Sequence, residues 1–383
     1  MAEAPLVSVL IPAYNYAHLL PQTLRSVFDQ RYRPIEVIVV DDGSSDQTPS
    51  VLASTPGIIV VRQENQGLSA ARNTAMRMAR GRYLQFLDAD DLLGPSAISR
   101  RVALLEAHPD LSSVVCRSAL FRDRVLPEWL AWLGREWRHP PCANAAIGLR
   151  YRNIAPPHAF LVRRAIVEQH GLRFDESLRA VEDYDFWLRL SDAAGPPALL
   201  RSGWVYYRQH ARSMSRNLAR QHAHDALVFH RICERELDRP TYAADGERGD
   251  RAAALFLGFV EIAEKLRASD PDACETFLAE HLDVLAAHLA QHLRQDRLGR
   301  VGWVYLASAR QFVATSVRRR LFAETVLDRM VGATHCGGWL FLRACRARTV
   351  AGEGAACLLR LLWRDFRFMV SGRLPTTPTS AGR

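Results

Sequence analysis

The chain has 383 residues, 48% of them hydrophobic, and a net charge of +9. This length is typical of two domains of roughly 150 residues each, and the apolar content suffices for packed cores. Lys265 is the only lysine and no glycine-rich phosphate loop surrounds it, which excludes a nucleotide site of the GK[ST] kind. The seven cysteines form no CxxC pair and are odd in number, so we expect reduced thiols.

No stretch approaches the roughly 18 to 20 apolar residues of a membrane-spanning helix, and the N-terminus has no signal region. We therefore expect a cytoplasmic protein. Residues 341–383 contain eight arginines against Glu353 and Asp365, a net charge of +6. A solvated helical face is the commoner interpretation of such a stretch. Peripheral contact of basic C-terminal helices with the inner face of a membrane is the alternative, and it stays open.

Short apolar runs alternate with helical stretches in the first third of the chain, a pattern typical of a parallel sheet covered by helices. Strands rich in Val, Ile, Leu or aromatic residues are predicted at Val7–Pro12, Ile35–Val40, Ile58–Arg62 and Tyr83–Leu87. A helix is predicted after each strand, at Ala17–Gln30, Thr48–Ala53, Gly67–Arg80 and Pro95–Ala107. We predict an α/β fold with a mainly parallel, Rossmann-like sheet.

The middle of the chain, residues 121–160, has an irregular pattern that predicts a loop-rich lid or acceptor region. Its tryptophans near paired prolines are Trp129, Trp132 and Trp137. A helix is predicted to begin near Glu182, and a last strand to span Ala198–Tyr207. Long helical segments follow, such as Ala252–Arg267 and Cys274–Arg294. We therefore predict a catalytic domain at residues 1–219 and an all-helical domain at residues 220–383.

Acidic clusters follow two of the predicted strands directly, one at Asp41–Asp46 and one at Asp88–Asp91, whereas Pro12–Asn15 follows the first strand. Ligands bind beyond the carboxyl ends of strands in open parallel sheets. Either cluster alone would favour a turn or a helix cap. Two clusters on one edge repel each other unless a cation or hydrogen-bond donors compensate. The pattern therefore predicts a hard divalent cation with oxygen ligands.

Four segments carry a resemblance to a known family: Val7–Asn15 (VSVLIPAYN), Val39–Asp46 (VVDDGSSD), Asn65–Asn73 (NQGLSAARN) and Asp88–Asp91 (DADD). In their residues, order and spacing these segments resemble those of the family-2 inverting glycosyltransferases with the GT-A fold. The resemblance covers roughly residues 5–215 and not the helical remainder. It implies transfer of a hexosyl or N-acetylhexosaminyl group from a nucleotide-diphosphate sugar to an acceptor hydroxyl, assisted by Mn²⁺ or Mg²⁺.

The resemblance also implies residue roles at the nucleotide-sugar site. Asp42 would accept from the edge of uracil, which favours a UDP-sugar, and Arg72 would lie near the base or the diphosphate. Asp88 would lie close to the ribose and the sugar, and Asp90 would bind the metal ion. The remaining residues of the nucleoside pocket would be Pro12, Ala13, Tyr14 and Asn15.

The reaction also needs a base that removes the acceptor's proton, and an ionised carboxylate is suitable. Glu182 and Asp183 match the family's Glu-Asp motif, which supplies this base from the start of a helix. Helical spacing predicts that Asp183 points inward, on the face of Trp187 and Leu190. Its place near a helix N-terminus favours the charged carboxylate. A helix cap is the alternative role, and the motifs upstream favour the catalytic one.

His210 lies in a segment similar to the Arg-x-His-x-x-Ser run found at the end of many such domains. The resemblance implies that it completes the metal shell or contacts the diphosphate, and a structural role is the alternative. A sugar nucleotidyltransferase and a dehydrogenase are disfavoured because no glycine-rich loop follows the first strand. No nucleic-acid module is present. A non-catalytic binding protein that uses its basic helices on a membrane or polymer is the main alternative. The acceptor, whether glycan, lipid-linked or protein, stays open.

Overall fold

A computed structural model describes residues 3–122, 135–136, 145–210, 213, 217–238 and 245–294. The chain divides into two compact units. The first combines Met1–Ala243 with Ala254–Leu278, and the second combines Ala244–Ala253 with Ala279–Arg383. The three tryptophans of the predicted lid and the basic stretch 341–383 lie outside the described residues. The predicted domain boundary at residue 219 stays a prediction.

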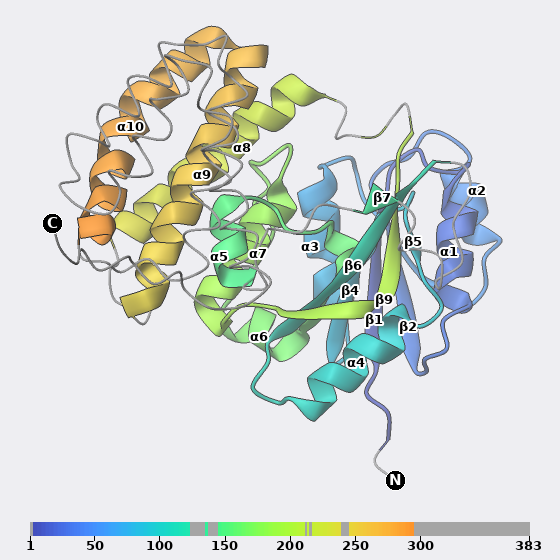
Figure 1. Ribbon diagram of the computed structural model, residues 1–383. Helices are drawn as coiled ribbons and strands as arrows, with labels where there is room; N and C mark the ends of the chain where they lie inside the picture. Colours follow the sequence, from blue (N-terminus) through green and yellow to red (C-terminus); the bar gives the residue numbers. More distant parts are fainter. Residues whose placement is uncertain are drawn as a thin grey trace, which may run out of the picture. The chain divides into compact units, whose positions relative to one another are not determined.

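The parallel half of the sheet confirms the four predicted strands. They are β1 (Val7–Ala13), β2 (Ile35–Asp41), β3 (Ile59–Arg62) and β4 (Tyr83–Phe86), in the spatial order β3-β2-β1-β4 (Figure 1). Every residue of β1 and β4 is buried, as expected for central strands covered on both faces. The register pairs Ala13 with Asp41, so the ends of β1 and β2 lie side by side.

The other half of the sheet is mixed and was only partly predicted. The order continues from β4 through β8 (Phe160–Arg163), β6 (Ser113–Phe121) and β9 (Ala198–Arg208) to β5 (Leu92–Leu93), and β7 (Arg135–Glu136) pairs with β6. β8 is antiparallel to both neighbours, whereas β6 and β9 are parallel to each other. β6 and β9 therefore end at the same edge as β1, β2 and β4.

The irregular region predicted at 121–160 contains regular structure in its described part. α5 (Ala145–Tyr151) and a 3₁₀ turn (Pro157–Ala159) lead directly into β8. The interpretation of the described part as loop was wrong because β8 is a four-residue antiparallel strand, too short to show a periodic pattern. The long β6, which precedes this region, was also missed.

The helices of the sheet region lie close to their predicted places. α1 (Leu20–Phe28), α2 (Thr48–Ala53), α3 (Leu68–Met78) and α4 (Ala97–Ala107) follow the strands as expected, and α6 (Arg164–Gln169) follows β8. α3 packs on β1 and β2, and α4 packs on β6 and β9. α7 begins at Glu182, as predicted, and ends at Ala194 before Gly195.

Long helices follow the sheet: α8 (Leu218–Asp238), α9 (Asp245–Ser269) and α10 (Pro271–Arg294). In the first unit, Phe229 of α8, Phe259 of α9 and Phe277 of α10 pack against one another, with centroid distances of 5.4–6.5 Å. The single lysine, Lys265, joins α9 to α8 through Asp225, 3.3 Å away. Among the described residues, no helix is both long enough and apolar enough to cross a bilayer.

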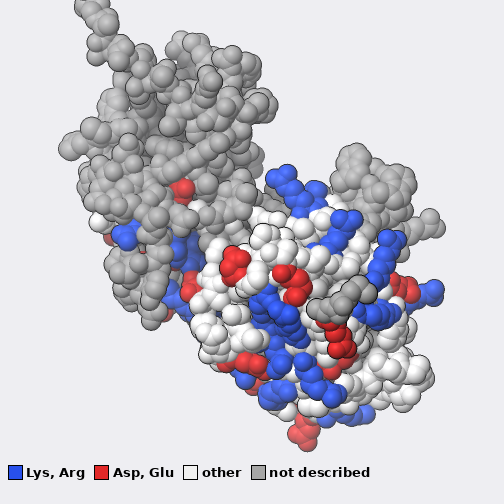
Figure 2. Space-filling view, turned by 90° about the horizontal axis from the view of Figure 1, so that it is seen from below, with Lys and Arg blue, Asp and Glu red and all other residues white. Residues whose placement is uncertain are grey.

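Basic side chains are not confined to the C-terminal stretch. Figure 2 shows basic and acidic side chains interspersed on the face seen from below, the side where the N-terminus lies in Figure 1. Arg80 and Arg82 are exposed and stand directly before β4, at the edge where the parallel strands begin. The acidic clusters stand at the opposite edge, where these strands end. Arg80 pairs with Glu36 and Arg82 with Glu106, so acidic partners accompany these arginines at this edge.

Candidate active site

The loops that follow β1 and β2 are joined by hydrogen bonds. Asn15, whose φ of 59° is in the left-handed region, accepts from the backbone N–H groups of Ser45 (2.8 Å) and Asp46 (3.2 Å) with its Oδ1. Its own N–H donates to Ser44 Oγ at 3.0 Å. Asn15 therefore shapes the site, since asparagine tolerates this backbone conformation better than most residues.

The first predicted segment divides into buried and exposed residues. Pro12 and Ala13 are buried at the end of β1. Tyr14 is 46% exposed, so its ring is accessible to a base or a sugar. A ring of this kind offers a flat apolar face with a polar tip, which suits stacking on a nucleoside.

Asp42 is buried and its carboxylate is already well occupied. Oδ1 accepts from Gln63 Nε2 (2.8 Å) and from the N–H of Gln66 (3.0 Å), and Oδ2 accepts from the N–H of Gly67 (2.8 Å). Gly67, at φ 97°, is the residue before α3. A carboxylate has about four acceptor positions, so about one is left for a ligand. Asp42 thus fixes the start of α3, whatever it contributes to a nucleoside.

The Arg72 guanidinium is buried between two carboxylates. Its side chain is 1% exposed, and it donates to Glu182 Oε1 (2.5 Å) and to Asp88 Oδ1 (2.6 Å). Burial alone would lower the pKa of the guanidinium, but the carboxylates of Asp88 and Glu182 outweigh burial and raise that pKa. Arg72 therefore bridges the loop Asp88–Asp91, here called the Asp-X-Asp loop, to the start of α7. Its contact with the base or diphosphate, which the resemblance implies, stays a prediction.

Asp90 meets His210 across the sheet edge. Its Oδ2 lies 2.8 Å from His210 Nε2, and the two residues come from the loops after β4 and β9. Tyr16 also faces this carboxylate: burial first, and then the charges of Asp90 and Asp88, raise the pKa of the Tyr16 hydroxyl far above its usual value. The Tyr16 ring lies edge-on to His210, with centroids 6.1 Å apart.

A buried set of contacts holds the Asp-X-Asp loop in place from behind. Asp91 Oδ1 accepts from the N–H of Arg208 at 2.7 Å, and Asp91 Oδ2 lies 3.1 Å from His158 Nδ1. The Arg208 side chain donates to the carbonyl of Asp90 at 2.7 Å. Burial raises the pKa of Asp91 to about 7, against the opposing effect of His158. β9 and the turn before β8 thus fix where Asp90 points.

The residues at this edge fit a divalent cation. Asp90 Oδ2 and His210 Nε2 share a hydrogen bond of 2.8 Å, and an oxygen and a nitrogen this close could instead serve as neighbouring ligands of one divalent cation. Both side chains are partly exposed, at 14% and 19%. Asp88 is held by Arg72, so diphosphate oxygens and water would complete the shell. Carboxylate with imidazole suits Mn²⁺ better than Mg²⁺, which prefers oxygen alone.

The start of α7 carries the second predicted group. Val181, just before the helix, has a φ of 52°, which a β-branched residue adopts only at a cost of about 1–3 kcal/mol. Asp183 Oδ2 accepts from Asn153 Nδ2 at 2.9 Å, and Oδ1 accepts from the N–H of Tyr184 at 2.8 Å. Strain of this kind is frequent at functional sites, where surrounding contacts hold the backbone.

The charge state of Asp183 differs from the prediction. Burial raises the pKa of its carboxyl to about 7 and Glu182 adds to this rise, whereas Arg72 and the Asn153 amide oppose it. The helix N-terminus was expected to favour the charged form, but the loss of hydration is the larger effect. A carboxyl that titrates near neutral pH can accept a proton from an alcohol and release it again.

Several residues of the site were not predicted from the sequence. Tyr16 is two positions beyond Tyr14, and its place in the same strand-end segment was an available signal. Asn153 and His158 lie in the region interpreted as loop, where no local pattern marks them. Their partners are more than 29 residues away in the chain, so only the folded structure reveals the pairs.

Comparison with known proteins identifies the family of the chain. Glycosyl transferase family 2, as a family-wide sequence model, matches residues 8–171. The chain is 30% identical over 317 residues to "Succinoglycan biosynthesis protein ExoO" of Rhizobium meliloti (strain 1021), covering 76% of this chain and 87% of ExoO. It spans only 28% and 63% of the length of two other curated relatives.

Solved structures share the fold at low sequence identity. S. aureus TarS 1–349 in complex with UDP-GlcNAc has a TM-score of 0.55 at 16% identity, over 85% of this chain and 88% of that one. The mannosyltransferase PcManGT from Pyrobaculum calidifontis, in complex with GDP-Man and Mn²⁺, has a TM-score of 0.52 at 20% identity, over 83% and 87%. The chain therefore has a GT-A fold followed by helices, and it belongs to glycosyltransferase family 2.

Proposed function

We propose that this glycosyltransferase moves a sugar from a nucleotide diphosphate, with UDP-sugars favoured, to an acceptor hydroxyl with inversion at the anomeric carbon. The observation that carries the proposal is the Arg72 guanidinium, which joins Asp88 of the Asp-X-Asp loop to Glu182 beside Asp183. Asp88 and Asp90, which we assign to the donor and the metal ion, are thus linked through Arg72 and Glu182 to Asp183, which we assign as the base.

On the donor side, Tyr14 and the loop shaped by Asn15 and Asp42 would receive the nucleoside. Asp90 and His210 would hold the divalent cation, which neutralises the diphosphate as it leaves. TarS binds UDP-GlcNAc and PcManGT binds GDP-Man with Mn²⁺, which supports a nucleotide sugar and a divalent cation here. UDP is favoured over GDP through the family resemblance at Asp42.

On the acceptor side, Asp183 would remove the proton of the incoming hydroxyl. Attack from the face opposite the diphosphate gives inversion, because the bond to the acceptor forms as the bond to the diphosphate breaks. The acceptor class is a glycan, a lipid-linked glycan or a protein, and succinoglycan biosynthesis by the relative ExoO supports a glycan. A cytoplasmic location and peripheral membrane contact through the basic stretch 341–383 belong to the same proposal.

The pH dependence of transfer follows from the base. Asp183 acts when it is deprotonated and its pKa is about 7, so kcat should rise as pH increases through 7. At pH 5 only about one Asp183 carboxyl in a hundred is ionised, and kcat should fall to about 1% of its plateau. Transfer measured between pH 5 and 9 with saturating donor checks this, and a flat profile would contradict the assignment.

Asp90→Ala should weaken metal-dependent donor binding itself. Titration calorimetry with UDP, with and without Mn²⁺, should show an affinity for wild-type protein that the cation enhances, and in the variant a loss of about tenfold to a hundredfold. Asp110→Ala, which removes an exposed acid outside the site, is the matched control and should bind as wild type does. Equal affinity in both variants would remove Asp90 from the metal site.

A non-catalytic family member is the second candidate. The basic stretch 341–383 would then bind a membrane or an acidic polymer. Tight metal-dependent binding of nucleotide without turnover of any nucleotide sugar would support that candidate. A screen of UDP-, GDP- and dTDP-sugars for metal-dependent transfer or hydrolysis separates the two.

A further inference from the structure

The hydrogen bond from Asn153 to Asp183 is donated by a residue outside the sheet, in the short segment between α5 and the turn before β8. Asn153 Nδ2 lies 2.9 Å from Asp183 Oδ2, and Asn153 stands two residues after α5. The end of α5 is therefore one of the two elements that place Asn153, together with the turn Pro157–Ala159 that follows it. The contacts of Leu149–Arg152 decide whether the amide reaches the carboxylate.

The end of α5 is tied to α7 and α8. Tyr184 Oη donates to the carbonyl of Leu149 at 2.6 Å. The Arg150 side chain is buried and donates through Nε to Glu236 Oε1 of α8 at 2.5 Å, and it also pairs with Asp192 of α7. The two carboxylates raise the pKa of Arg150 against the effect of its burial. Removing either carboxylate would leave part of this buried charge uncompensated, which is destabilising.

α9 supports the same segment from a further side. Arg152 Nη1 lies 3.5 Å from Glu261 Oε1. A Cβ atom at Gly258 would lie 2.8 Å from the carbonyl oxygen of Tyr151, which is closer than real Cβ atoms approach. Only glycine therefore allows α9 to approach the backbone of α5 this closely, and this explains a glycine in a helix interior where alanine is preferred.

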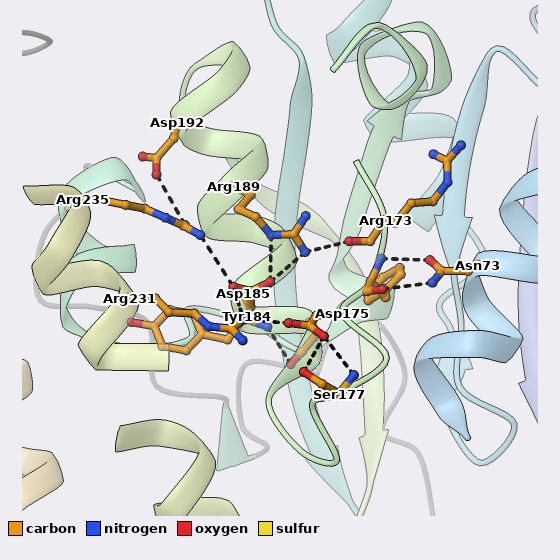
Figure 3. A network of polar contacts seen from close by, with 12 residues as sticks. Asn73, Arg173, Asp175, Ser177, Tyr184, Asp185, Arg189, Asp192, Arg231 and Arg235 are labelled. Atoms are coloured by element: carbon orange, nitrogen blue, oxygen red, sulfur yellow. Dashed lines mark hydrogen bonds and ion pairs between the residues drawn. The ribbon is translucent and has the colours of Figure 1, made fainter. Parts of the chain in front are cut away.

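α8 also holds α7, the helix that carries Asp183. Figure 3 shows Asp185 of α7 between Arg189 of its own helix and two arginines of α8. Arg231 lies 3.3 Å and Arg235 lies 3.9 Å from Asp185 Oδ1, and Arg231 also pairs with Asp175 at 2.9 Å. Asp185 is 1% exposed, and these arginines supply its ion-pair partners. α8 thus contacts both the end of α5, which precedes the donor Asn153, and α7, which carries the acceptor Asp183.

We infer that α8 and α9 form a frame that positions the catalytic base by holding Asn153 against Asp183 through the end of α5. This inference rests on the proposed function, in which Asp183 is the base. Asn153 is a positioning residue, and Glu236 and Gly258 act through it. The helices that follow the sheet are then part of the reaction site's structure. Removing a contact in the frame lowers the rate of transfer while the donor site stays intact.

The first test replaces the amide. Asn153→Ala should reduce kcat about tenfold to a hundredfold, the range for loss of a hydrogen bond to a charged group. The affinity for UDP with Mn²⁺ should stay within about twofold of wild type. The acid limb of the pH profile should move to higher pH, because the amide stabilises the ionised carboxylate. The charged groups that face Asp183 are Glu182 and Arg72, and neither is altered.

The second test changes the frame at a distance from the base. Glu236→Ala and Gly258→Ala should each lower kcat and move the acid limb in the same direction as Asn153→Ala. Glu234→Ala removes an exposed carboxylate of the same helix α8 and should behave as wild type. Thermal unfolding and UDP binding of each full-length variant identify any loss of fold. Asn153→Ala is the variant for which we expect the smallest loss of stability, because the Asn153 side chain is only half-buried.

Titration of the carboxyl carbon of Asp183 by NMR, assigned with Asp183→Asn, separates this inference from the proposed function. A higher pKa of Asp183 in Asn153→Ala, Glu236→Ala and Gly258→Ala than in wild type supports the frame even if no transfer is detected. Absence of transfer by wild type with every nucleotide sugar would count against the function alone. An unchanged Asp183 pKa and pH profile in Glu236→Ala and Gly258→Ala would overturn the frame.

Discussion

Asp183→Asn is expected to abolish sugar transfer, with kcat reduced by about 10² to 10⁴, the contribution typical of a positioned general base. Asparagine has nearly the same shape but cannot accept the acceptor's proton. The base acts on the acceptor, so the affinity for UDP with Mn²⁺ should be close to that of wild type. Transfer assays at saturating donor, combined with calorimetry, measure the two effects separately. Transfer at the native rate would show that another group is the base.

The same variant should be more stable than wild type at alkaline pH. The pKa of Asp183 is about 7 in the folded protein and about 3.9 in an unfolded chain. Between these values the folded state binds more protons, so the contribution of Asp183 to stability falls as pH rises and stays unfavourable above pH 7. The amide of the substituted asparagine does not ionise. Thermal unfolding of Asp183→Asn should therefore show a gain over wild type at pH 8 that disappears near pH 4.

The parallel half of the fold could be predicted because its information is local. β1 and β2 are apolar runs, and acidic or small residues follow them directly. Parallel strands that alternate with helices end at one edge of the sheet. The order of the strands in the sequence therefore predicted that Asp42, Asp88 and Asp90 lie at that edge. This inference needed no tertiary contact, and the structure agrees with it.

The mixed half of the sheet could not be predicted in the same way. β8 is four residues long and is inserted antiparallel between β4 and β6, and its stability comes from its neighbours rather than from its own pattern. His158 reaches the site because it lies in the turn that leads into β8, and Asn153 lies between α5 and that turn. A pattern read along the chain contains no signal for such an insertion.

The raised pKa of Asp183 and the two carboxylate partners of Arg72 could not be predicted from the sequence for a related reason. Each was argued from the nearest feature: the helix N-terminus for Asp183 and the family motif for Arg72. The structure shows that burial decides the first, and that two carboxylates from segments 16 and 110 residues away decide the second. Electrostatics in a buried site depends on the whole set of neighbours, which sequence spacing does not give.

Arg72→Met should cause the largest loss of stability of any single change at the site. The guanidinium is 1% exposed and is bound by Asp88 and Glu182, so methionine leaves two carboxylates without their cation at the edge where acidic groups gather. Removing one partner of a buried ion pair costs about 3–5 kcal/mol. Urea unfolding of the full chain, followed by circular dichroism, should show a decrease of this size.

Two further variants identify the cause of that loss. Arg77→Met removes an exposed arginine from the same helix α3 and should change stability by no more than about 0.5 kcal/mol. Arg72→Lys keeps the charge, but a single ammonium lacks the fork that lets arginine bind two carboxylates at once, so it should restore only part of the stability. If Arg72→Met unfolded at the same urea concentration as Arg77→Met, Arg72 would not be the bridge that joins the Asp-X-Asp loop to α7.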